Sequence, residues 1–236
     1  MMDYFIFGDI DSRDYNVWLF DLNTDEAPES LMTEIKVPGR NGALLQSNRT
    51  FENMQHRYMG VIYENAADNL GWFRNAMMEN LGYIKLEDSI HPEEFYVARY
   101  VGGLEPKLSP DRQMVKFAIE FSRKPQRFLA SGEEEVIVPN GGTIENPTLF
   151  DSQPAITVKG YGTLSINGNS VTIENYSRSE ITIDSEMMDC FYEDYNLNQY
   201  VTFSNNRFPV LRKGANGINY SGNITEVRIV PRWWQI

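Results

Sequence analysis

Alternation of apolar and polar residues is clearest in the segment 163–173. The apolar positions that alternate there are Leu164, Ile166, Val171 and Ile173. Between the two halves stands Asn167-Gly168, a pair that tolerates the positive φ angles of a tight primed turn. Because side chains alternate between the faces of a strand, the pattern predicts a β-hairpin with one buried and one solvated face.

The same alternation returns in three other segments of the last third of the chain, Ile156–Val158, Ile181–Ile183 and Val227–Ile229. Glycines separate the segments, at Gly160, Gly162, Gly214, Gly217 and Gly222. Several half-buried strands at short spacing, with no helical period between them, favour two antiparallel sheets packed face to face. We therefore expect a β-sandwich in the C-terminal part.

The first part of the chain also has strand-like segments, and one helix among them. The predicted strands are Tyr4–Phe7, Val17–Leu22, Met32–Val37, Tyr83–Leu86, Phe95–Val101 and Gln113–Phe121. A turn is expected at Pro38–Gly42. The N-terminal part is thus expected to be α+β within a mainly β protein.

The helix is predicted over residues 65–82, because apolar residues recur there at three- and four-residue steps. The stripe consists of Leu70, Phe73, Met77 and Leu81. Asn65 is expected to cap its start and Gly82 to end it. Packing of the stripe on a sheet is favoured over binding of a cofactor.

A domain boundary is predicted just after Phe128, where apolar periodicity is interrupted. The interruption comprises the acidic run Glu133–Glu135 and the turn-rich stretch Pro139–Gly142, with a short strand expected at Val136–Val138 between them. The expected domains are residues 1–130 and 131–236, joined closely rather than by a loose tether.

Composition narrows the class of protein. The chain has 236 residues, 42% of them hydrophobic and 23% charged, which is an ordinary soluble globular balance. No apolar run approaches the ~20 residues that cross a bilayer, and the first residues lack a basic leader region, so neither a membrane span nor ordinary secretion is expected. A net charge of −12 argues against binding to nucleic acid or an anionic membrane.

Candidate chemistry is sparse. Cys190 is the single cysteine, which excludes an internal disulfide and an all-cysteine metal cluster. The two histidines, His56 and His91, form no metalloprotease motif. Gly160 and Gly162 follow a predicted strand, but a hairpin follows them instead of the helix that a phosphate loop requires.

Three carboxylates, Asp184, Glu186 and Asp189, lie close in sequence. We interpret them as loop residues and not as a glycosidase pair. The sequence therefore predicts no catalytic residue, no cofactor and no metal site, and a protein that is not an enzyme.

Ordered sequence blocks nevertheless carry a family resemblance. They are Val37–Gly42, Phe121–Pro125, Asn146–Thr148, Gln153–Ile156, Ile181–Glu186, Phe208–Asn216 and Pro231–Trp234. Each block is weak alone, but the ordered set spans almost the whole chain. On these blocks the chain resembles the distal tail (Dit) proteins, which are hub components of siphophage tails.

The resemblance implies a structural virion protein of a siphophage or prophage. In that family a β-rich N-terminal domain with one helix closes into a sixfold ring around the DNA channel, and a galectin-like sandwich projects outward. The implied partners are other copies of the chain in a homohexamer, the tail tube protein, the tail-associated hub or lysin protein and, in some phages, receptor-binding proteins. The implied location is the baseplate at the virion tail tip, after assembly in the bacterial host cytoplasm.

A closed ring needs contacts between different surfaces of identical subunits, and long edge strands of the first domain could supply them. DNA would pass through the lumen without specific binding. We hypothesise that acidic residues such as Glu133, Glu134 and Glu135 could face the lumen and repel DNA.

The alternative function is a carbohydrate-binding sandwich that attaches to host cell-surface glycans. Its candidate stacking residues are Phe191, Tyr192, Tyr195 and Tyr200. Core and subunit packing is favoured for these side chains, because aromatic residues dominate buried contacts. A tail-tip enzyme has only the scattered carboxylates in its favour.

Overall fold

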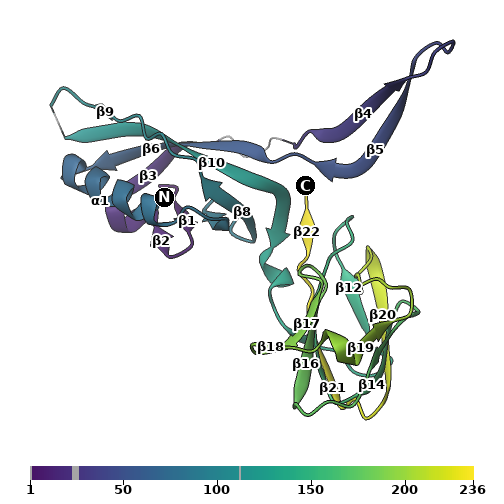
Figure 1. The fold of residues 1–236 in the computed structure, drawn as a ribbon. Coiled ribbons are helices and arrows are strands. Elements are labelled where there is room, and N and C mark those ends of the chain that lie inside the picture. Colours follow the sequence, from purple (N-terminus) through teal and green to yellow (C-terminus); the bar gives the residue numbers. More distant parts are fainter. Residues whose placement is uncertain (1, 23–26, 112) are drawn as a thin grey trace. The chain divides into compact units, whose positions relative to one another are not determined.

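The computed structural model describes residues 2–22, 27–111 and 113–236. The chain divides into two compact units, one made of residues 1–127 with Ile236 and one of residues 128–235. Both are built from antiparallel sheets, and a single α-helix lies in the first (Figure 1). The protein is thus mainly β, as the alternation of apolar residues predicts.

The main sheet of the first unit has the strand order β2-β1-β7-β8-β10-β6-β3, and β9 also pairs with β10. These strands are β1 (Phe5–Phe7), β2 (Ile10–Asp11), β3 (Val17–Leu22), β6 (Met54–Tyr63), β7 (Ile84–Asp88), β8 (Glu94–Tyr100), β9 (Lys107–Leu108) and β10 (Met114–Leu129). The longest pairing joins β6 to β10, from Met114 opposite Tyr63 to Arg123 opposite Met54. A short 3₁₀ helix, Ser12–Tyr15, connects β2 to β3.

An aromatic core lies on one face of this sheet. Phe5 stacks on Tyr58 with ring centroids 5.6 Å apart, and the rings of Phe73 and Phe121 meet Phe5 edge-on. Gly60 leaves room for this packing, because a Cβ there would lie 2.7 Å from the ring of Phe117. Large side chains therefore fill the first unit's interior.

The predicted helix is α1 (Ala66–Glu79), and its stripe packs into the core through Phe73 and Met77. The helix starts after Asn65 as predicted, but the predicted capping bond is not formed and the predicted C-terminal end was wrong. Asn65 has left-handed backbone angles and no side-chain capping bond, because a cap needs an extended backbone to aim its side chain at the helix N–H groups. The helix ends before Gly82, so Leu81 lies beyond it and is 65% exposed.

Two consecutive strands, β5 (Ala43–Phe51) and β6, were not predicted from the sequence. Strand β5 pairs with β4 (Ser30–Lys36), the strand predicted at Met32–Val37. The expected turn at Pro38–Gly42 lies between them, with positive φ at Gly39 and Gly42. The remaining predicted strands of this unit are confirmed, Val17–Leu22 with the predicted bounds and the others with shifted ends, and β10 is much longer than expected.

The second unit contains two sheets, ordered β11-β21-β13-β16-β17-β18 and β12-β20-β14-β15-β19. Strands of the first sheet are β11 (Val136–Ile137), β13 (Ala155–Lys159), β16 (Glu180–Asp184), β17 (Asp189–Tyr192), β18 (Tyr195–Asn196) and β21 (Glu226–Val230). Strands of the second are β12 (Thr143–Asn146), β14 (Gly162–Ile166), β15 (Asn169–Ile173), β19 (Val201–Phe203) and β20 (Gly214–Gly222). Two 3₁₀ helices, Ala130–Gly132 and Asn198–Tyr200, and the last strand β22 (Trp234–Gln235) complete the unit.

The predicted hairpin is formed by β14 and β15, with φ of 52° at Asn167 and 82° at Gly168. Its four alternating apolar residues are all buried. They share one core with Ile156, Ile183 and Ile229 of the other sheet, which lie opposite one another on three neighbouring strands. Because both sheets contribute to one apolar core, the predicted β-sandwich is confirmed.

The chain's last residues close the second unit. The N–H of Leu129 donates to the carbonyl of Trp233 at 2.9 Å, and the N–H of Arg232 donates to that of Gly132 at 2.7 Å. The Arg232 guanidinium binds Asp184 at both oxygens, at 2.8 and 2.7 Å. A bidentate pair on a buried carboxylate fixes this segment on the sandwich.

We predict that Gly162→Ala destabilises the second unit by about 3 kcal/mol or more, since a Cβ there would lie 2.1 Å from the carbonyl oxygen of Ser221. Gly168→Ala is the matched control, because its φ is also positive but nothing lies within 4 Å. The control should lose only about 1–2 kcal/mol, the ordinary strain of a left-handed residue. Urea unfolding of the full chain measures both, and equal losses would contradict the close-approach argument.

We also predict that Asp184→Asn lowers the free energy of unfolding by about 2–4 kcal/mol, because it removes the bidentate partner of Arg232 and leaves only Glu186, at 3.6 Å, as an anion beside it. Asp151→Asn, the same change at an exposed position, should have little effect. Thermal unfolding of both variants beside the parent chain provides the measurement. A loss no larger than that of the control would show that the ion pair contributes nothing net.

Candidate functional site

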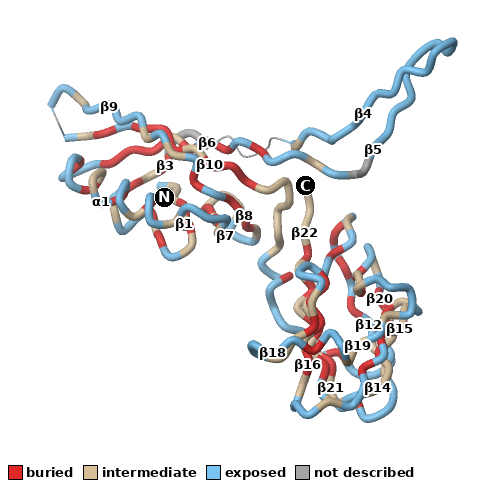
Figure 2. Tube along the Cα trace, viewed as in Figure 1, coloured by how far each residue is buried: buried red, intermediate tan, exposed pale blue. Residues whose placement is uncertain are grey.

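One two-stranded element, the hairpin of β4 and β5, has no other strand paired to it among the described residues. Every residue from 29 to 47 is exposed, and the two strands are pale blue over this stretch in Figure 2. Two strands without a third, or without a packed face, are marginal in water. The hairpin is therefore the described element with the fewest stabilising contacts to the rest of its own chain.

Exposed apolar side chains lie on both faces of this hairpin. Ile35 stands directly opposite Leu44, so the two side chains share a face with Val37. Met32 and Leu45 lie on the other face. Apolar faces together with unpaired edges are features of a surface that binds another chain.

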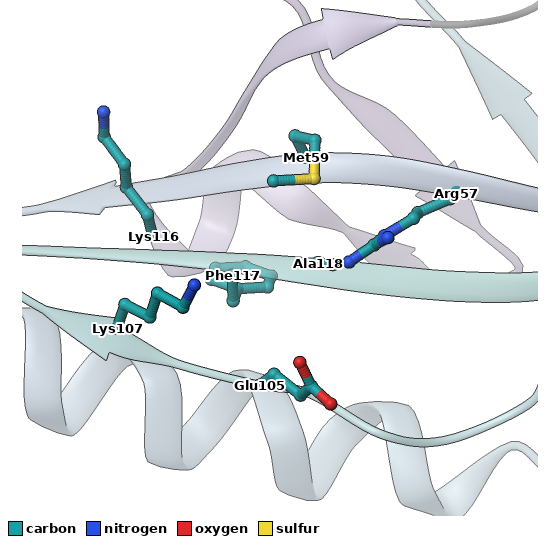
Figure 3. A pocket seen from close by; sticks show the side chains of 7 residues that line it. All are labelled: Arg57, Met59, Glu105, Lys107, Lys116, Phe117 and Ala118. Atoms are coloured by element: carbon teal, nitrogen blue, oxygen red, sulfur yellow. The ribbon is translucent and has the colours of Figure 1, made fainter.

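Two cavities of the described residues are smaller than a typical site for an organic cofactor. One, shown in Figure 3, encloses about 70 Å³ and is lined by Arg57, Lys107 and Lys116 together with Glu105 and the ring of Phe117. A second, of about 250 Å³, lies between α1 and β9 and is lined mainly by apolar side chains. Pockets for organic ligands usually enclose roughly 300–1,000 Å³.

Both histidines lie in the first unit, His56 on β6 and His91 after β7. His56 is buried and packs edge-on against Tyr58 at 4.4 Å. The described residues contain no group of three His, Cys, Asp or Glu side chains placed to hold a metal ion. Burial raises the pKa of Cys190 to about 12, so its thiol stays protonated.

The three candidate carboxylates of the second unit perform structural tasks. Burial alone would raise the pKa of Asp184, but hydrogen bonds from Arg232 and from the N–H groups of Met187 and Glu186 hold it below its ordinary value. Asp189 accepts hydrogen bonds from the side chains of Asn196 and Asn198. These acids order the turns at either end of β17, and none is paired with another carboxylate across an open cleft.

Glu133, Glu134 and Glu135 are exposed and belong to the second unit, just after a 3₁₀ helix. Glu135 lies 3.5 Å from Arg228. Arg228 also pairs with Glu180 and with Glu226, so three carboxylates surround one guanidinium. The acidic run is thus part of the outer face of a sandwich sheet.

The four aromatic candidates for sugar stacking are divided. Tyr192 and Tyr200 pack against the sandwich core, as the packing interpretation predicts. Tyr195 is exposed, and the guanidinium of Arg178 lies 3.9 Å from its ring centroid. Phe191 is partly exposed. One ring face of Tyr195 is therefore covered by a cation.

No family model matches this sequence, and no curated protein matches it. The described part of the chain holds no helix long and apolar enough to cross a lipid bilayer.

Solved structures do match the fold. The crystal structure of the SPP1 Dit protein (gp 19.1), described as a paradigm of the hub adsorption apparatus in phages infecting Gram-positive bacteria, superposes with a TM-score of 0.72 at 10% identity and covers 100% of both chains. A chain of the phage P2 baseplate in its activated conformation with Ca matches with a TM-score of 0.53 at 11% identity, covering 97% of this chain and 98% of that one. The corresponding baseplate with Sr gives 0.51 at 9% identity and the same coverage. This chain therefore has, over its full length, the fold of a phage Dit hub protein.

Proposed function

We propose that this chain is the structural subunit of a distal tail hub in a siphophage or prophage. In this proposal the first unit closes with other copies into a ring, and the ring connects the tail tube to the tail-tip proteins. The full-length match of both units to a phage hub protein supports the architecture. The observation that carries self-association is the unsupported β4–β5 hairpin with its apolar faces.

The hairpin suits a ring because its two edges differ. Strand β4 presents one edge and β5 the other, so the β4 edge of one copy can meet a different surface of the next. Contacts of this heterologous kind generate closed rings when the rotation between copies closes. Burying Ile35, Val37 and Leu44 between copies would supply apolar contact that the isolated subunit lacks.

Under this proposal the partners are further copies in a homohexamer, the tail tube protein, the tail-associated hub or lysin protein and possible receptor-binding proteins. The subunit would be assembled in the host cytoplasm and reside at the virion tail tip. DNA would cross the lumen unbound. Because Glu133, Glu134 and Glu135 belong to the second unit, a lumen built by the first unit would take its carboxylates from other residues.

The sugar-binding alternative has less support. Of the four aromatic candidates, Tyr192 and Tyr200 are occupied by core packing, and Arg178 covers a face of Tyr195. A stacking platform needs an open ring face, so the remaining surface is poor for a sugar ring. Catalysis would need a reactive group in a cleft, and the carboxylates that the sequence offers are engaged in turns.

We predict that the purified chain forms a hexamer of about 163 kDa, six times the subunit mass of 27.2 kDa, alone or on co-expression with the tail tube protein. The double variant Ile35→Asn, Leu44→Asn should raise the protein concentration needed for half-assembly by at least tenfold, because it removes apolar contact from one hairpin face. Mass photometry over a dilution series measures the distribution.

Leu149→Asn is the matched control, since Leu149 is 81% exposed but lies in the second unit. It should leave the hexamer unchanged. A chain that stays monomeric with and without the tube protein would contradict the ring. Binding of that monomer to cell-wall glycans would instead favour the carbohydrate-binding alternative.

A further inference from the structure

Both histidines of the chain are linked to one buried carboxylate, Asp88 at the end of β7: His91 lies beside it, and His56 packs against Tyr58, which binds it. Oδ2 of Asp88 accepts a hydrogen bond from the Tyr58 hydroxyl at 2.8 Å. Its Oδ1 accepts bonds from the N–H groups of Ile90 and His91, each at 3.0 Å, and lies 3.8 Å from Nδ1 of His91. One carboxylate therefore fixes both a core tyrosine and the turn that follows β7.

His56 is the buried member of this group, with 3% of its surface exposed. Its ring centroid lies 4.4 Å from that of Tyr58 and 6.2 Å from that of Tyr96. Its Nε2 has no hydrogen-bond partner in the described part of the chain. Arg123 of β10 is equally buried, with its guanidinium 4.3 Å from the Tyr96 ring centroid and Nη2 3.6 Å from Sδ of Met54.

The charged groups around His56 come from two strands: Asp88 on β7 is the anion and Arg123 on β10 is the cation. The rings of Tyr58 and Tyr96 pack against the imidazole, and His91 lies in the turn beside Asp88. The ion pair of Arg127 with Glu94, at 3.4 Å, lies beyond Tyr96. A proton on His56 would place a second cation beside Arg123 where water does not reach.

Burial first, and Arg123 second, lower the pKa of His56 to about 4, against the attraction of Asp88. An exposed histidine has an ordinary pKa of 6.5. An open state therefore binds more protons than the closed state between these values, so the closed state loses stability as pH falls from about 6.5 toward 4.

The turn after β7 also holds the start of the chain. Ser89 donates its N–H to the carbonyl of Tyr4 at 3.1 Å, and its hydroxyl accepts from the N–H of Tyr4 and donates to Asp3. Opening the turn would thus loosen the segment that leads into β1.

We propose that the Asp88 cluster, defined as His56, Tyr58, Asp88, His91 and Arg123, is an acid-operated latch of the first unit. At neutral pH it keeps the turn 89–93 closed, and mild acid releases the turn and lets His56 reach water. The second unit contains neither histidine and stays folded. The latch does not depend on ring formation.

Hydrogen exchange of the full-length chain, corrected for intrinsic rates, tests the latch at pH 7.5 and pH 4.5. Protection of the Ile90 and His91 amides should fall on the order of 100-fold, while amides of β13 and β16 keep theirs. His56→Phe keeps an aromatic ring against Tyr58 but cannot titrate, and it should abolish the response. His91→Gln should retain it.

Equal protection of Ile90 and His91 at both pH values overturns the latch. A loss of protection in acid that persists in His56→Phe, or that is absent in His91→Gln, also overturns it. If His56→Phe fails to fold, the imidazole NMR signals of the parent chain decide, with His91→Gln identifying the signal of His56. The His56 signal should titrate well below pH 6 and together with the exchange of Ile90. Titration near 6.5 with no change in exchange would refute the proposal.

Discussion

Antiparallel backbone pairing is the constraint on which this structure rests. In the described residues the regular elements are strands, apart from one α-helix and short 3₁₀ turns. The N–H and C=O groups of a strand can only be satisfied by a neighbouring strand, a side chain or water. Within the two units most strands have neighbours on both sides and one face on an aromatic or aliphatic core. The β4–β5 hairpin follows the same constraint but stops after two strands, so its outer edges are not paired to another strand of the described residues.

Polar groups in the interior serve this architecture. Asp184 accepts hydrogen bonds from Arg232, 48 residues away, and Asp88 accepts one from Tyr58, 30 residues away. Each carboxylate also accepts hydrogen bonds from N–H groups of the turn that follows its own strand. The two units thus use one device, a buried acid at a strand end that ties a turn to a distant side chain. Among the acids of the second unit, Asp184 and Asp189 are engaged in hydrogen bonds that order the neighbouring turns.

Sequence predicts the sandwich better than the first unit for a physical reason. Leu164, Ile166 and their partners alternate because one face of their hairpin is buried, and Asn167-Gly168 marks the turn. Strand β5 has no buried face over most of its length, so nothing imposes alternation on it, and β6 carries His56 and Gly60 at positions where an apolar residue would be expected. The Asp88 cluster joins three strands, β6, β7 and β10, and the turn after β7 through tertiary contacts, and spacing along the chain gives no sign of it. Of the exposed hairpin, the sequence predicted the first strand, at Met32–Val37, and the turn Pro38–Gly42, but not the second strand.

The return of the C-terminus to Leu129 and Gly132 has an evolutionary consequence. The second unit enters after Arg127 and leaves before Ile236, and Arg127 donates a hydrogen bond to the carbonyl of that last residue at 2.8 Å. Topologically, the sandwich is a cassette whose entry and exit points are adjacent. Such a cassette can be enlarged, exchanged or replaced by a different module without changing the chain path of the first unit. The first unit can then be retained while the second diversifies.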